Sequence, residues 1–496
     1  MKRGMFPVRS RDSLNYWCTW SSQNDIAGRK GTAKGLTAKD FEGAAGAALA
    51  RDEMNEDTLL GKGGLCDAFP ALRGDLYLVL DDGWDVPYGA GRESIRDFGS
   101  LTLDTTRFPS FTGTPAERLQ KLNDAVKSRG WKGLGIWVAP QLCHEQFGVK
   151  YEEAPSLHEA YWRERILWSR HADVRYWKVD WGKDSASVSC RSMMTELGKR
   201  LFPELVIEHT FPLMPINGEP KQGTVRFAEQ EAALAKAKAI LSFSEVYRSY
   251  DVTDDRLSAC STLDRLSEML PFSYGVVNCE DELYVGAALG CAVGIMRSVY
   301  GKGRSQRSER LDEVTAALRW QTYAPAFAGG VLETSDELLY DECFFTRNDT
   351  WYGEIMDTTV TQAAPAVMAR NTALPTVEPT ERAPFVLAAQ NPTGAYALAA
   401  VKRYRYRENT EMPRVACFAD TPERVGIFGD FETVTLSFSQ KPTAMTVQSL
   451  AGGEVRSVEL SDYADDNRLV LPYSLLARYR ISTDQSENAV MLTFTY

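Results

Sequence analysis

The sequence predicts an α/β fold, in which a (β/α)8 TIM barrel is followed by a C-terminal antiparallel β-sandwich domain. Three observations lead to this prediction. A chain of 496 residues exceeds one average domain and has room for a barrel of roughly 250 to 350 residues plus a smaller module. Apolar β-rich runs alternate with helix-like stretches over about residues 15–330, and beyond about residue 335 strand-like runs alternate with turn clusters. We therefore expect a barrel domain over residues 1–335 and a sandwich domain over residues 336–496.

Eight short β-rich runs are the expected barrel strands, and they should lie parallel because a helix returns the chain between them. In chain order these runs are Tyr16–Trp20, Leu76–Leu80, Gly135–Ala139, Arg175–Val179, Leu205–Ile207, Ile240–Phe243, Tyr274–Val277 and a last strand near Ala324–Ala328. The segments between them have apolar residues at spacings of three and four, which favours helices. The clearest helical segments are Pro115–Arg129, Leu157–Arg170, Ser192–Leu201 and Ala228–Lys238.

The C-terminal part reads as an antiparallel β module, because short strand-like runs are separated by turn residues and no helical period intervenes. The boundary with the barrel is inferred from composition to lie near Gly329-Gly330. The strand-like runs are Thr350–Ile355, Ala395–Ala400, Thr433–Phe438, Leu469–Leu471 and Ala489–Phe494.

Bulk properties restrict the partners. The net charge is −11 and no Lys/Arg-rich run occurs, so neither nucleic acid nor an anionic membrane would be attracted, and a neutral small substrate fits better. The first residues lack the apolar run of a secretory signal, and no apolar run of membrane-spanning length follows. We therefore expect a cytoplasmic protein. The sequence does not indicate an oligomeric state.

Cysteine and histidine usage bears on redox state and metals. The nine cysteines are scattered singly without a CxxC pair, which is typical of reduced thiols in a reducing compartment. With four histidines and no HxH or HExxH motif, a hydrolytic zinc site has little to be built from. We expect neither a disulfide framework nor metal catalysis.

Acidic residues follow four of the expected strands, at the position where barrel enzymes carry their catalytic groups. A strand buried on both faces rarely ends in charge without a functional reason, so these segments are candidate site segments. They are Asp81-Asp82-Gly83-Trp84, Lys178-Val179-Asp180-Trp181, Glu208-His209-Thr210, and the stretch from Glu245 that contains Arg248, Asp251, Asp254 and Asp255.

Each segment also has a structural interpretation. Asp-Asp-Gly is a good turn sequence, so Asp81 and Asp82 could serve only a turn. Lys178 and Asp180 lie on the same side of their strand and could form a structural ion pair inside the barrel mouth. The segment Asp251–Asp255 looks like a helix start, where at least two of the three aspartates would be capping residues.

Tryptophans and paired carboxylates together suggest a chemistry. Core burial is the default for any single tryptophan, yet several beside strand ends also suit the apolar platforms on which sugar rings stack. Glycosidic bond cleavage needs two carboxyl groups, one that attacks or activates water and one that protonates the leaving oxygen. A lysine beside the attacking carboxylate would keep it ionised. The tryptophans concerned are Trp17, Trp20, Trp84, Trp137 and Trp181.

In their order along the chain, these segments resemble the retaining α-galactosidase clan, the melibiase-like glycoside hydrolase families 27 and 36, over roughly residues 15–330. Leu80-Asp81-Asp82-Gly83-Trp84 resembles the clan's Asp-Asp-Cys-Trp segment, whose acids bind the 4- and 6-hydroxyls of galactose. Tyr176-Trp177-Lys178-Val179-Asp180 resembles its Lys-x-Asp nucleophile strand, in which the lysine reaches the 3- and 4-hydroxyls. Two later segments, Asn278-Cys-Glu-Asp281 and Leu318-Arg-Trp320, resemble the clan's last two barrel units.

The resemblance implies a mechanism of double displacement with retention and no cofactor. Asp180 would attack the anomeric carbon, and Asp251 would act as acid/base, because Arg248-Ser-Tyr-Asp251-Val-Thr-Asp254 resembles the clan's Arg-x-x-x-Asp-Ile-x-Asp loop. The spacing from the arginine is one residue short, so Asp254 and Asp255 remain alternatives. The two carboxyl groups of a retaining pair lie about 5–5.5 Å apart.

Two departures from the clan's pattern concern the environment and the substrate. Gly83 replaces a cysteine that secreted family 27 enzymes tie into a disulfide, which agrees with reduced thiols. Thr210, in His209-Thr210-Phe211-Pro212, stands where many α-galactosidases have a glutamate that binds the 2-hydroxyl, whereas Leu213 is galactosidase-like. The 2-substituent of the sugar therefore stays open.

The sequence-based hypothesis is a retaining exo-glycosidase that acts on terminal α-galactosides. The alternatives are an α-N-acetylgalactosaminidase, a β-L-arabinopyranosidase or a raffinose-synthase-like transglycosylase, and a catalytically inactive sugar-binding barrel ranks lowest. Besides the catalytic pair, the expected substrate-binding residues are Trp20, Asp81, Asp82, Trp84, Trp137, Lys178, Trp181, Glu208, His209, Thr210, Arg248, Asp254 and Asp255.

Overall fold

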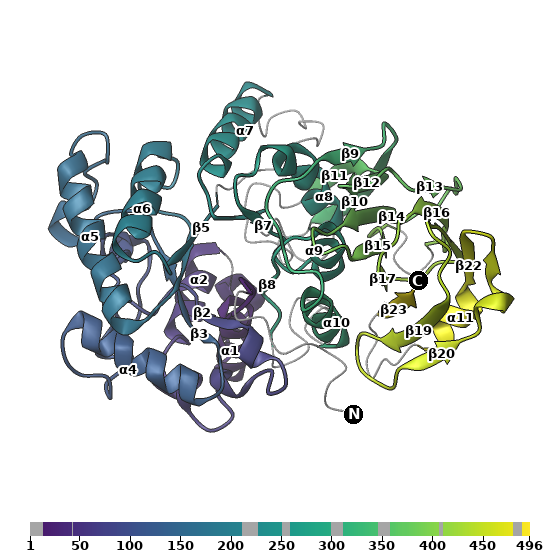
Figure 1. Ribbon diagram of the computed structural model, residues 1–496. Helices are drawn as coiled ribbons and strands as arrows, with labels where there is room; N and C mark the ends of the chain where they lie inside the picture. Colours follow the sequence, from purple (N-terminus) through teal and green to yellow (C-terminus); the bar gives the residue numbers. More distant parts are fainter. Residues whose placement is uncertain are drawn as a thin grey trace.

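A computed structural model gives the architecture, and it describes residues 13–41, 43–210, 227–249, 258–298, 311–345, 358–405, 410–479 and 489–496. A parallel barrel with its helices occupies the left and centre of Figure 1, and β sheets formed by the C-terminal part lie on the right. The expected order of a barrel followed by a β module is confirmed.

Eight parallel strands form the barrel sheet in the order β7-β6-β5-β4-β3-β2-β1-β8. The two ends of this order meet through a parallel bridge between Asn278 and Ala292, so the barrel is nearly closed. The strands are β1 (Tyr16–Cys18), β2 (Tyr77–Leu80), β3 (Gly133–Val138), β4 (Tyr176–Val179), β5 (Val206–His209), β6 (Val246–Arg248), β7 (Val276–Asn278) and β8 (Gly294–Ile295).

Helices surround this sheet, and their ends follow local sequence signals. In α4 (Pro115–Ser128), Thr114 and Glu117 form a reciprocal capping box and proline occupies the first turn. Helix α5 (Pro155–Ala172) also begins with proline and ends at Asp173 in a left-handed conformation. The other helices described in this region are α1 (Trp20–Ala33), α2 (Gly43–Asp52), α3 (Glu56–Leu60), α6 (Val188–Leu201), α7 (Phe227–Leu241), α8 (Ser258–Met269), α9 (Leu283–Leu289) and α10 (Leu311–Gln321).

Two of the expected barrel strands are wrong. The run Ile240–Phe243 covers the end of α7 and the turn after it, and the sixth strand is Val246–Arg248. The run near Ala324–Ala328 is a loop after α10, while the eighth strand is the two-residue Gly294–Ile295. The end of α7 supplied the apolar residues of the first run, and a loop supplied those of the second.

Because successive side chains of a strand point to opposite faces, the barrel strands contribute to two separate apolar cores. One set of side chains fills the barrel interior, where Tyr16 packs edge-to-face on Tyr176 with ring centroids 5.4 Å apart. The bulk of Tyr16 is accommodated because the facing residue is Gly294, where a Cβ atom would lie 2.6 Å from the ring. The other set, such as Trp17 and Trp177, points outward and packs beneath the helices in the main apolar core.

The C-terminal part contains mixed rather than purely antiparallel sheets. An eight-stranded sheet has the order β20-β19-β23-β17-β15-β14-β12-β9, and a five-stranded sheet has the order β13-β16-β18-β22-β21. The pairs β12–β14, β15–β17 and β16–β18 are parallel. The expected run Thr350–Ile355 lies outside the described residues, and the other four expected runs coincide with strands.

The strands of this part are short, and one helix lies among them. They are β9 (Leu332–Thr334), β10 (Leu338–Phe345), β11 (Thr358–Pro365), β12 (Val367–Arg370), β13 (Thr376–Val377), β14 (Phe385–Gln390), β15 (Tyr396–Val401), β16 (Arg414–Phe418), β17 (Arg424–Phe428), β18 (Thr433–Ser437), β19 (Ala444–Ser449), β20 (Arg456–Val458), β21 (Ala464–Asp465), β22 (Arg468–Pro472), α11 (Tyr473–Arg478) and β23 (Ala489–Thr495).

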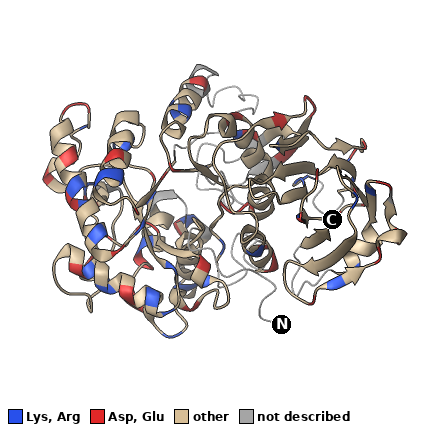
Figure 2. Ribbon diagram, viewed as in Figure 1, with Lys and Arg blue, Asp and Glu red and all other residues tan. Residues whose placement is uncertain are grey.

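The eight-stranded and the five-stranded sheet differ in burial. Strand β18 alternates buried and partly exposed residues, so one face of the five-stranded sheet packs on the larger sheet and the other faces solvent. Strand β15 is buried throughout, because helices α9 and α10 of the barrel cover the outer face of the larger sheet. Charged residues are dense on α4, α5 and α6 in Figure 2, and much of the C-terminal part is tan. None of the described helices has the length and apolar character needed to cross a membrane.

Candidate active site

Six charged side chains meet inside the barrel at the carboxyl ends of its strands, where TIM-barrel enzymes place their active sites. Two are cations and four are carboxylates, and all are at least nine-tenths buried. Because period-two alternation turns every second side chain inward, the strand ends of β2, β4, β5, β6 and β7 deliver them to one place. They are Asp81, Lys178, Asp180, Glu208, Arg248 and Glu280.

Lys178 crosses the barrel to the acid that follows β2. Its Nζ lies 2.8 Å from Asp81 Oδ2 and 3.6 Å from Glu280 Oε1, and the Cys18 thiol donates to the same Asp81 oxygen at 2.9 Å. Burial opposes the charge on Asp81, but the adjacent Lys178 outweighs it and lowers the pKa of that carboxyl. Burial likewise opposes the Lys178 charge, yet Asp81 raises the lysine pKa well above its usual value. The alternative interpretation paired Lys178 with Asp180, but the cation that pairs with Asp180 in the structure is Arg248.

Arg248 ends β6 and holds three carboxylates with three nitrogens. Its Nη2 lies 3.0 Å from Asp180 Oδ2, its Nη1 lies 2.9 Å from Glu280 Oε2, and its Nε lies 3.2 Å from Glu208 Oε1. The guanidinium is 1% exposed, and burial alone would favour its neutral form. Glu280 and Asp180 reverse that effect and raise the pKa of Arg248 well above its usual value. The fork of an arginine suits this task because its donors point in fixed directions.

The two oxygens of Asp180 have different environments. Oδ2 accepts from Arg248 and from the Trp137 indole Nε1 at 3.2 Å. Oδ1 is buried and accepts no hydrogen bond from any described residue. The backbone is fixed as well, since Asp180 N donates to Val138 O at 3.0 Å and Arg191 donates to Asp180 O at 2.8 Å. The carboxylate is therefore held by one oxygen while the other stays available to an incoming atom.

The pKa of Asp82, beside Asp81, is shifted in the opposite direction. Its Oδ2 lies 2.7 Å from Arg51 Nε, which comes from α2, and its Oδ1 is buried without a hydrogen bond in the described structure. Burial raises the pKa of Asp82 to about 7, against the effect of Arg51 and with added repulsion from Asp81 and Asp180. Neighbouring carboxyls with separated pKa values are typical of functional sites.

Aromatic rings form one wall beside Asp180. The ring centroids of Trp137 and Trp181 lie 5.1 Å apart, and Phe98 lies 5.1 Å from Trp181. Trp181 is partly exposed, whereas Trp84 is fully buried and donates to Trp137 O at 3.0 Å. Two further tryptophans lie apart from this wall: Trp20 is partly exposed at the first turn of α1, and Trp17 is buried in the outer core. Trp181 thus gives the partly exposed aromatic surface next to the candidate nucleophile, and the buried Trp137 lies between it and the core.

The side chains of the expected substrate-binding segment at the end of β5 are engaged in contacts with other protein residues. Glu208 accepts from Tyr176 and Asn278, both at 2.7 Å, besides pairing with Arg248. His209 lies behind the strand, with ring nitrogens 3.2 Å from Arg191 Nη1 and 2.7 Å from Thr195 Oγ1. Burial, with the Arg191 charge, lowers the pKa of His209 well below its usual value, so the ring is neutral.

Thr210 is also buried, and its Oγ1 donates to Arg248 O at 3.1 Å. In this conformation the hydroxyl stabilises the end of β6. The candidate acids Asp251, Asp254 and Asp255 lie outside the described residues, as do Phe211, Pro212 and Leu213.

Three residues of the site were not expected from the sequence. The only sequence signal for Glu280 is that it lies two positions after Asn278, the last residue of β7. Side-chain alternation therefore points Glu280 to the same inner side as Asn278. Tyr16 donates to Glu208 at 3.2 Å and to Glu280 at 3.1 Å, and its tyrosine-rich strand gives no sign of this role. Arg51 belongs to helix α2, which is distant in sequence from Asp82, so only the tertiary structure brings the two side chains together.

A separate small hollow lies at the other end of the barrel. Its lining includes Asn15, just before β1, and Asp75, just before β2, so it opens at the amino ends of the strands. TIM-barrel enzymes have their active sites at the opposite end, where the carboxyl ends of the strands lie. None of the six charged residues described above lines this hollow.

Comparisons with known proteins show distant similarity. No protein-family model and no curated protein matches the chain. Among solved structures, a protein from Bacteroides fragilis provisionally described as an α-galactosidase/melibiase is 14% identical, with a TM-score of 0.38 over 97% of this chain and 79% of that one. An α-amylase from Geobacillus thermoleovorans in complex with acarbose is 10% identical, with a TM-score of 0.41 over 98% and 99% of the two chains. Similarity at this level leaves the activity to be argued from the residues of this chain.

Proposed function

We propose that this protein is a retaining glycoside hydrolase whose nucleophile is Asp180. The observation that carries the proposal is the divided environment of that carboxylate, with Oδ2 fixed by Arg248 and Trp137 and Oδ1 without a hydrogen bond from the described part of the chain. A nucleophilic carboxylate must be ionised, oriented and free to form a bond through one oxygen. A purely structural ion pair would have no reason to leave a buried oxygen unsatisfied, because such an oxygen costs about 1–3 kcal/mol.

The surroundings of Asp180 suit a neutral polyol. Carboxylates and an ammonium group recognise hydroxyl groups by accepting and donating hydrogen bonds, and Asp81, Asp82 and Lys178 supply both kinds on one side. The partly exposed ring of Trp181, packed on Trp137, supplies an apolar surface near the carboxylate. Sugar rings present both kinds of surface, apolar faces and hydroxyl edges.

The proposed reaction has two steps. Asp180 Oδ1 attacks the anomeric carbon and the glycosidic bond breaks, while an acid gives its proton to the leaving oxygen. Water then attacks the same carbon, the residue that acted as acid takes a proton from that water, and the Asp180 carboxylate leaves. The resemblance of the Arg248–Asp254 segment to the clan's acid/base loop nominates Asp251 as this acid, with Asp254 and Asp255 as alternatives.

The proposed substrate is a terminal α-galactoside, on the same resemblance. Thr210 keeps α-N-acetylgalactosaminides and β-L-arabinopyranosides in view, because it stands where a glutamate would bind the 2-hydroxyl. A panel of the nitrophenyl α-galactoside, α-N-acetylgalactosaminide, α-glucoside and β-L-arabinopyranoside separates these possibilities. Product analysis with an added acceptor sugar separates hydrolysis from transglycosylation.

The decisive experiment assigns the two carboxyl roles by stereochemistry. With α-galactosyl fluoride and azide, Asp180→Ala should give the glycosyl azide of inverted configuration, because azide attacks from the face that the carboxylate occupied. Asp251→Ala with azide should give the retained configuration, since the glycosyl-enzyme still forms. The matched control is Asp173→Asn, a surface acid paired with Lys127 and Arg175, which should hydrolyse like the wild type. Wild-type turnover by Asp180→Ala would overturn the nucleophile assignment.

A further inference from the structure

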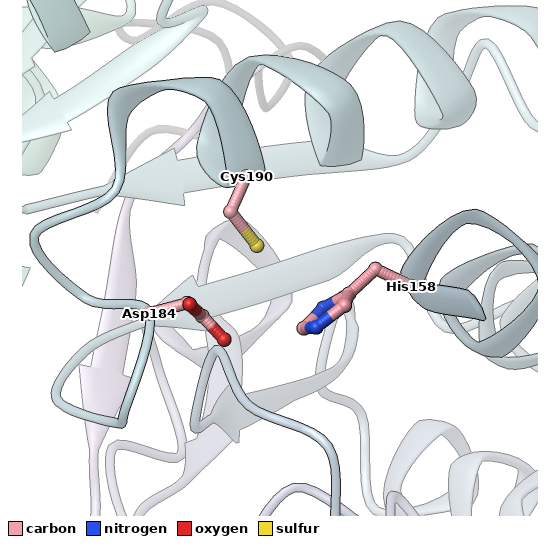
Figure 3. A group of neighbouring side chains, drawn as sticks. All are labelled: His158, Asp184 and Cys190. Atoms are coloured by element: carbon pink, nitrogen blue, oxygen red, sulfur yellow. The ribbon is translucent and has the colours of Figure 1, made fainter. Parts of the chain in front are cut away.

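A buried histidine, aspartate and cysteine meet on the outer side of the barrel. His158 comes from α5, Asp184 from the loop after β4, and Cys190 from the first turn of α6. One potential ligand atom from each lies within 4.8 Å of the other two, and all three residues are buried. In Figure 3 the three side chains point toward a common centre.

Two buried polar atoms of this cluster have no hydrogen-bond partner among the described residues. His158 is 0% exposed and Asp184 is 1% exposed, yet His158 Nδ1 and Asp184 Oδ2 form no hydrogen bond with any described residue. An unpaired buried polar atom costs about 1–3 kcal/mol, so two beside a thiol call for a physical explanation.

The other atoms of these side chains are already arranged by neighbours. His158 Nε2 lies 3.0 Å from Val149 O, and a ring nitrogen facing a carbonyl must carry the proton. That tautomer leaves a lone pair on Nδ1, the usual arrangement when a second-shell carbonyl orients a metal-bound histidine. Asp184 Oδ1 accepts from Tyr151 N at 3.3 Å and lies 4.0 Å from Lys150 Nζ, which leaves Oδ2 for the cluster.

We propose that His158, Asp184 and Cys190 bind a divalent transition metal ion, with Zn²⁺ as the first candidate. Imidazole, carboxylate and thiolate are the three side-chain ligand types of zinc, and a thiolate disfavours Mg²⁺ and Ca²⁺. One neutral imidazole and two anions balance the charge of the ion, which a buried site requires. Ligand atoms around tetrahedral zinc lie about 3.3–3.8 Å apart, so the separation found here closes with small side-chain rotations.

This ion would have a structural role. It would join α5, α6 and the loop after β4, and that loop begins with Asp180, four positions before Asp184. The site is distinct from the charged residues of the barrel mouth, so it neither requires nor supports the proposed glycosidase activity. Binding would stabilise the folded chain because the three ligands are assembled only on folding.

Metal content tests the proposal directly. The full-length protein, purified without a chelator after expression with added zinc, should contain about one zinc ion per chain by mass spectrometry. Cys190→Ser and His158→Gln should each reduce zinc to background. The matched controls are Cys417→Ser, a buried thiol of the C-terminal sheets, and His144→Gln, an exposed histidine, and both should keep the full content.

Cobalt substitution of the wild type keeps the test valid if a variant fails to fold. Co²⁺ bound through Cys190 should give a thiolate-to-metal charge-transfer band in the near ultraviolet, and zinc should displace it. The chelated wild type should unfold at a lower temperature, and zinc should restore the midpoint. A wild type that binds neither zinc nor cobalt at equimolar concentration, or a cobalt spectrum without a thiolate band, would overturn the proposal.

Discussion

The barrel mouth and the junction between the barrel and the C-terminal sheets are both built around a fully buried arginine. Arg248 at the mouth faces three carboxylates. Arg370, on β12 at the junction, faces backbone carbonyls instead: it donates to Leu289 O at 2.8 Å, Phe327 O at 3.0 Å and Gly329 O. Glu280 and the other acids raise the pKa of Arg248, whereas burial lowers the pKa of Arg370.

The difference indicates that Arg370 stabilises the structure, whereas Arg248 organises the charged groups of the candidate site. Carbonyls at the junction come from the end of α9 and the segment after α10, so Arg370 fastens three chain segments without any acid. At the mouth, Arg248 holds more negative charge than it neutralises, and Lys178 supplies the second cation. Excess buried acid is costly for stability, and it is the arrangement that a site for carboxylate chemistry needs.

The largest expected effect follows from Arg248→Met. The substitution leaves Asp180, Glu208 and Glu280 without their shared cation, and breaking a buried ion pair costs about 3–5 kcal/mol. We also expect kcat/KM to fall at least about 100-fold, because Asp180 loses one of the two donors on Oδ2. Denaturant unfolding and steady-state kinetics measure the two effects. Arg248→Lys, which keeps charge without the fork, should lie between wild type and Arg248→Met. Unchanged kinetics in both variants would mean that Arg248 is structural like Arg370.

Arg370→Met should reduce stability alone. Several carbonyls then lose a buried donor, which we expect to lower the free energy of unfolding by about 2–4 kcal/mol. The folded enzyme should keep its kcat/KM within about twofold, since the substitution is made outside the barrel mouth. A loss of activity that exceeds the unfolded fraction would show that the junction communicates with the mouth.

A smaller effect is expected in the pH dependence of stability through Asp82. Burial raises its folded-state pKa from 3.8 to about 7, so its contribution is fully present below the unfolded pKa and is lost as the pH rises through about 7. The free energy of unfolding of the wild type relative to Asp82→Asn should therefore fall between about pH 4 and about pH 7, by at most roughly 4 kcal/mol. Asp173→Asn is the control, because salt bridges lower the pKa of Asp173 and its contribution is lost only at acidic pH. A flat difference for Asp82 would contradict a raised pKa.

The smallest effect is expected from Arg414→Ala on the exposed face of β16. Arg414 pairs with Glu378 at 3.2 Å and Glu432 at 2.5 Å, but solvent and salt screen these charges. The thermal midpoint and kcat/KM should match those of the wild type. A clear loss of stability would show that charge pairing alone, without burial, stabilises this protein.

The sequence predicted strands that stand out as isolated apolar runs, and it failed where an apolar helix and an apolar strand or loop adjoin. Strands such as β2 and β4 are short apolar runs with acids at their ends, and both were predicted within about one residue. The eighth strand was missed because Gly294–Ile295 lies shortly after the apolar helix α9 in one continuous apolar stretch, and a two-residue strand has no period of its own. The order of the acids was likewise readable, since barrel topology brings successive strand ends together.

The sequence could not predict which charged residues of the site form ion pairs with each other. Lys178 and Asp180 are neighbours on one face of β4, which favoured a local pair, yet each finds its partner across the barrel. The reach of a lysine or arginine across a closed sheet depends on the interior volume that residues such as Tyr16 leave. Arg51 could not be found at all, because its position depends on how α2 packs over the barrel mouth.

Asn278 joins the two ends of the barrel sheet to the charged network. Its Oδ1 accepts from Gly294 N at 2.7 Å beside the bridge that closes β7 onto β8, and its Nδ2 donates to Glu208 at 2.7 Å. Opening of the barrel along this seam would therefore withdraw a donor from Glu208 and alter the charge that Arg248 must balance. Opening of the sheet along this seam and the charge balance at the barrel mouth are thus coupled through Asn278. Hydrogen exchange at the Gly294 amide would report the opening.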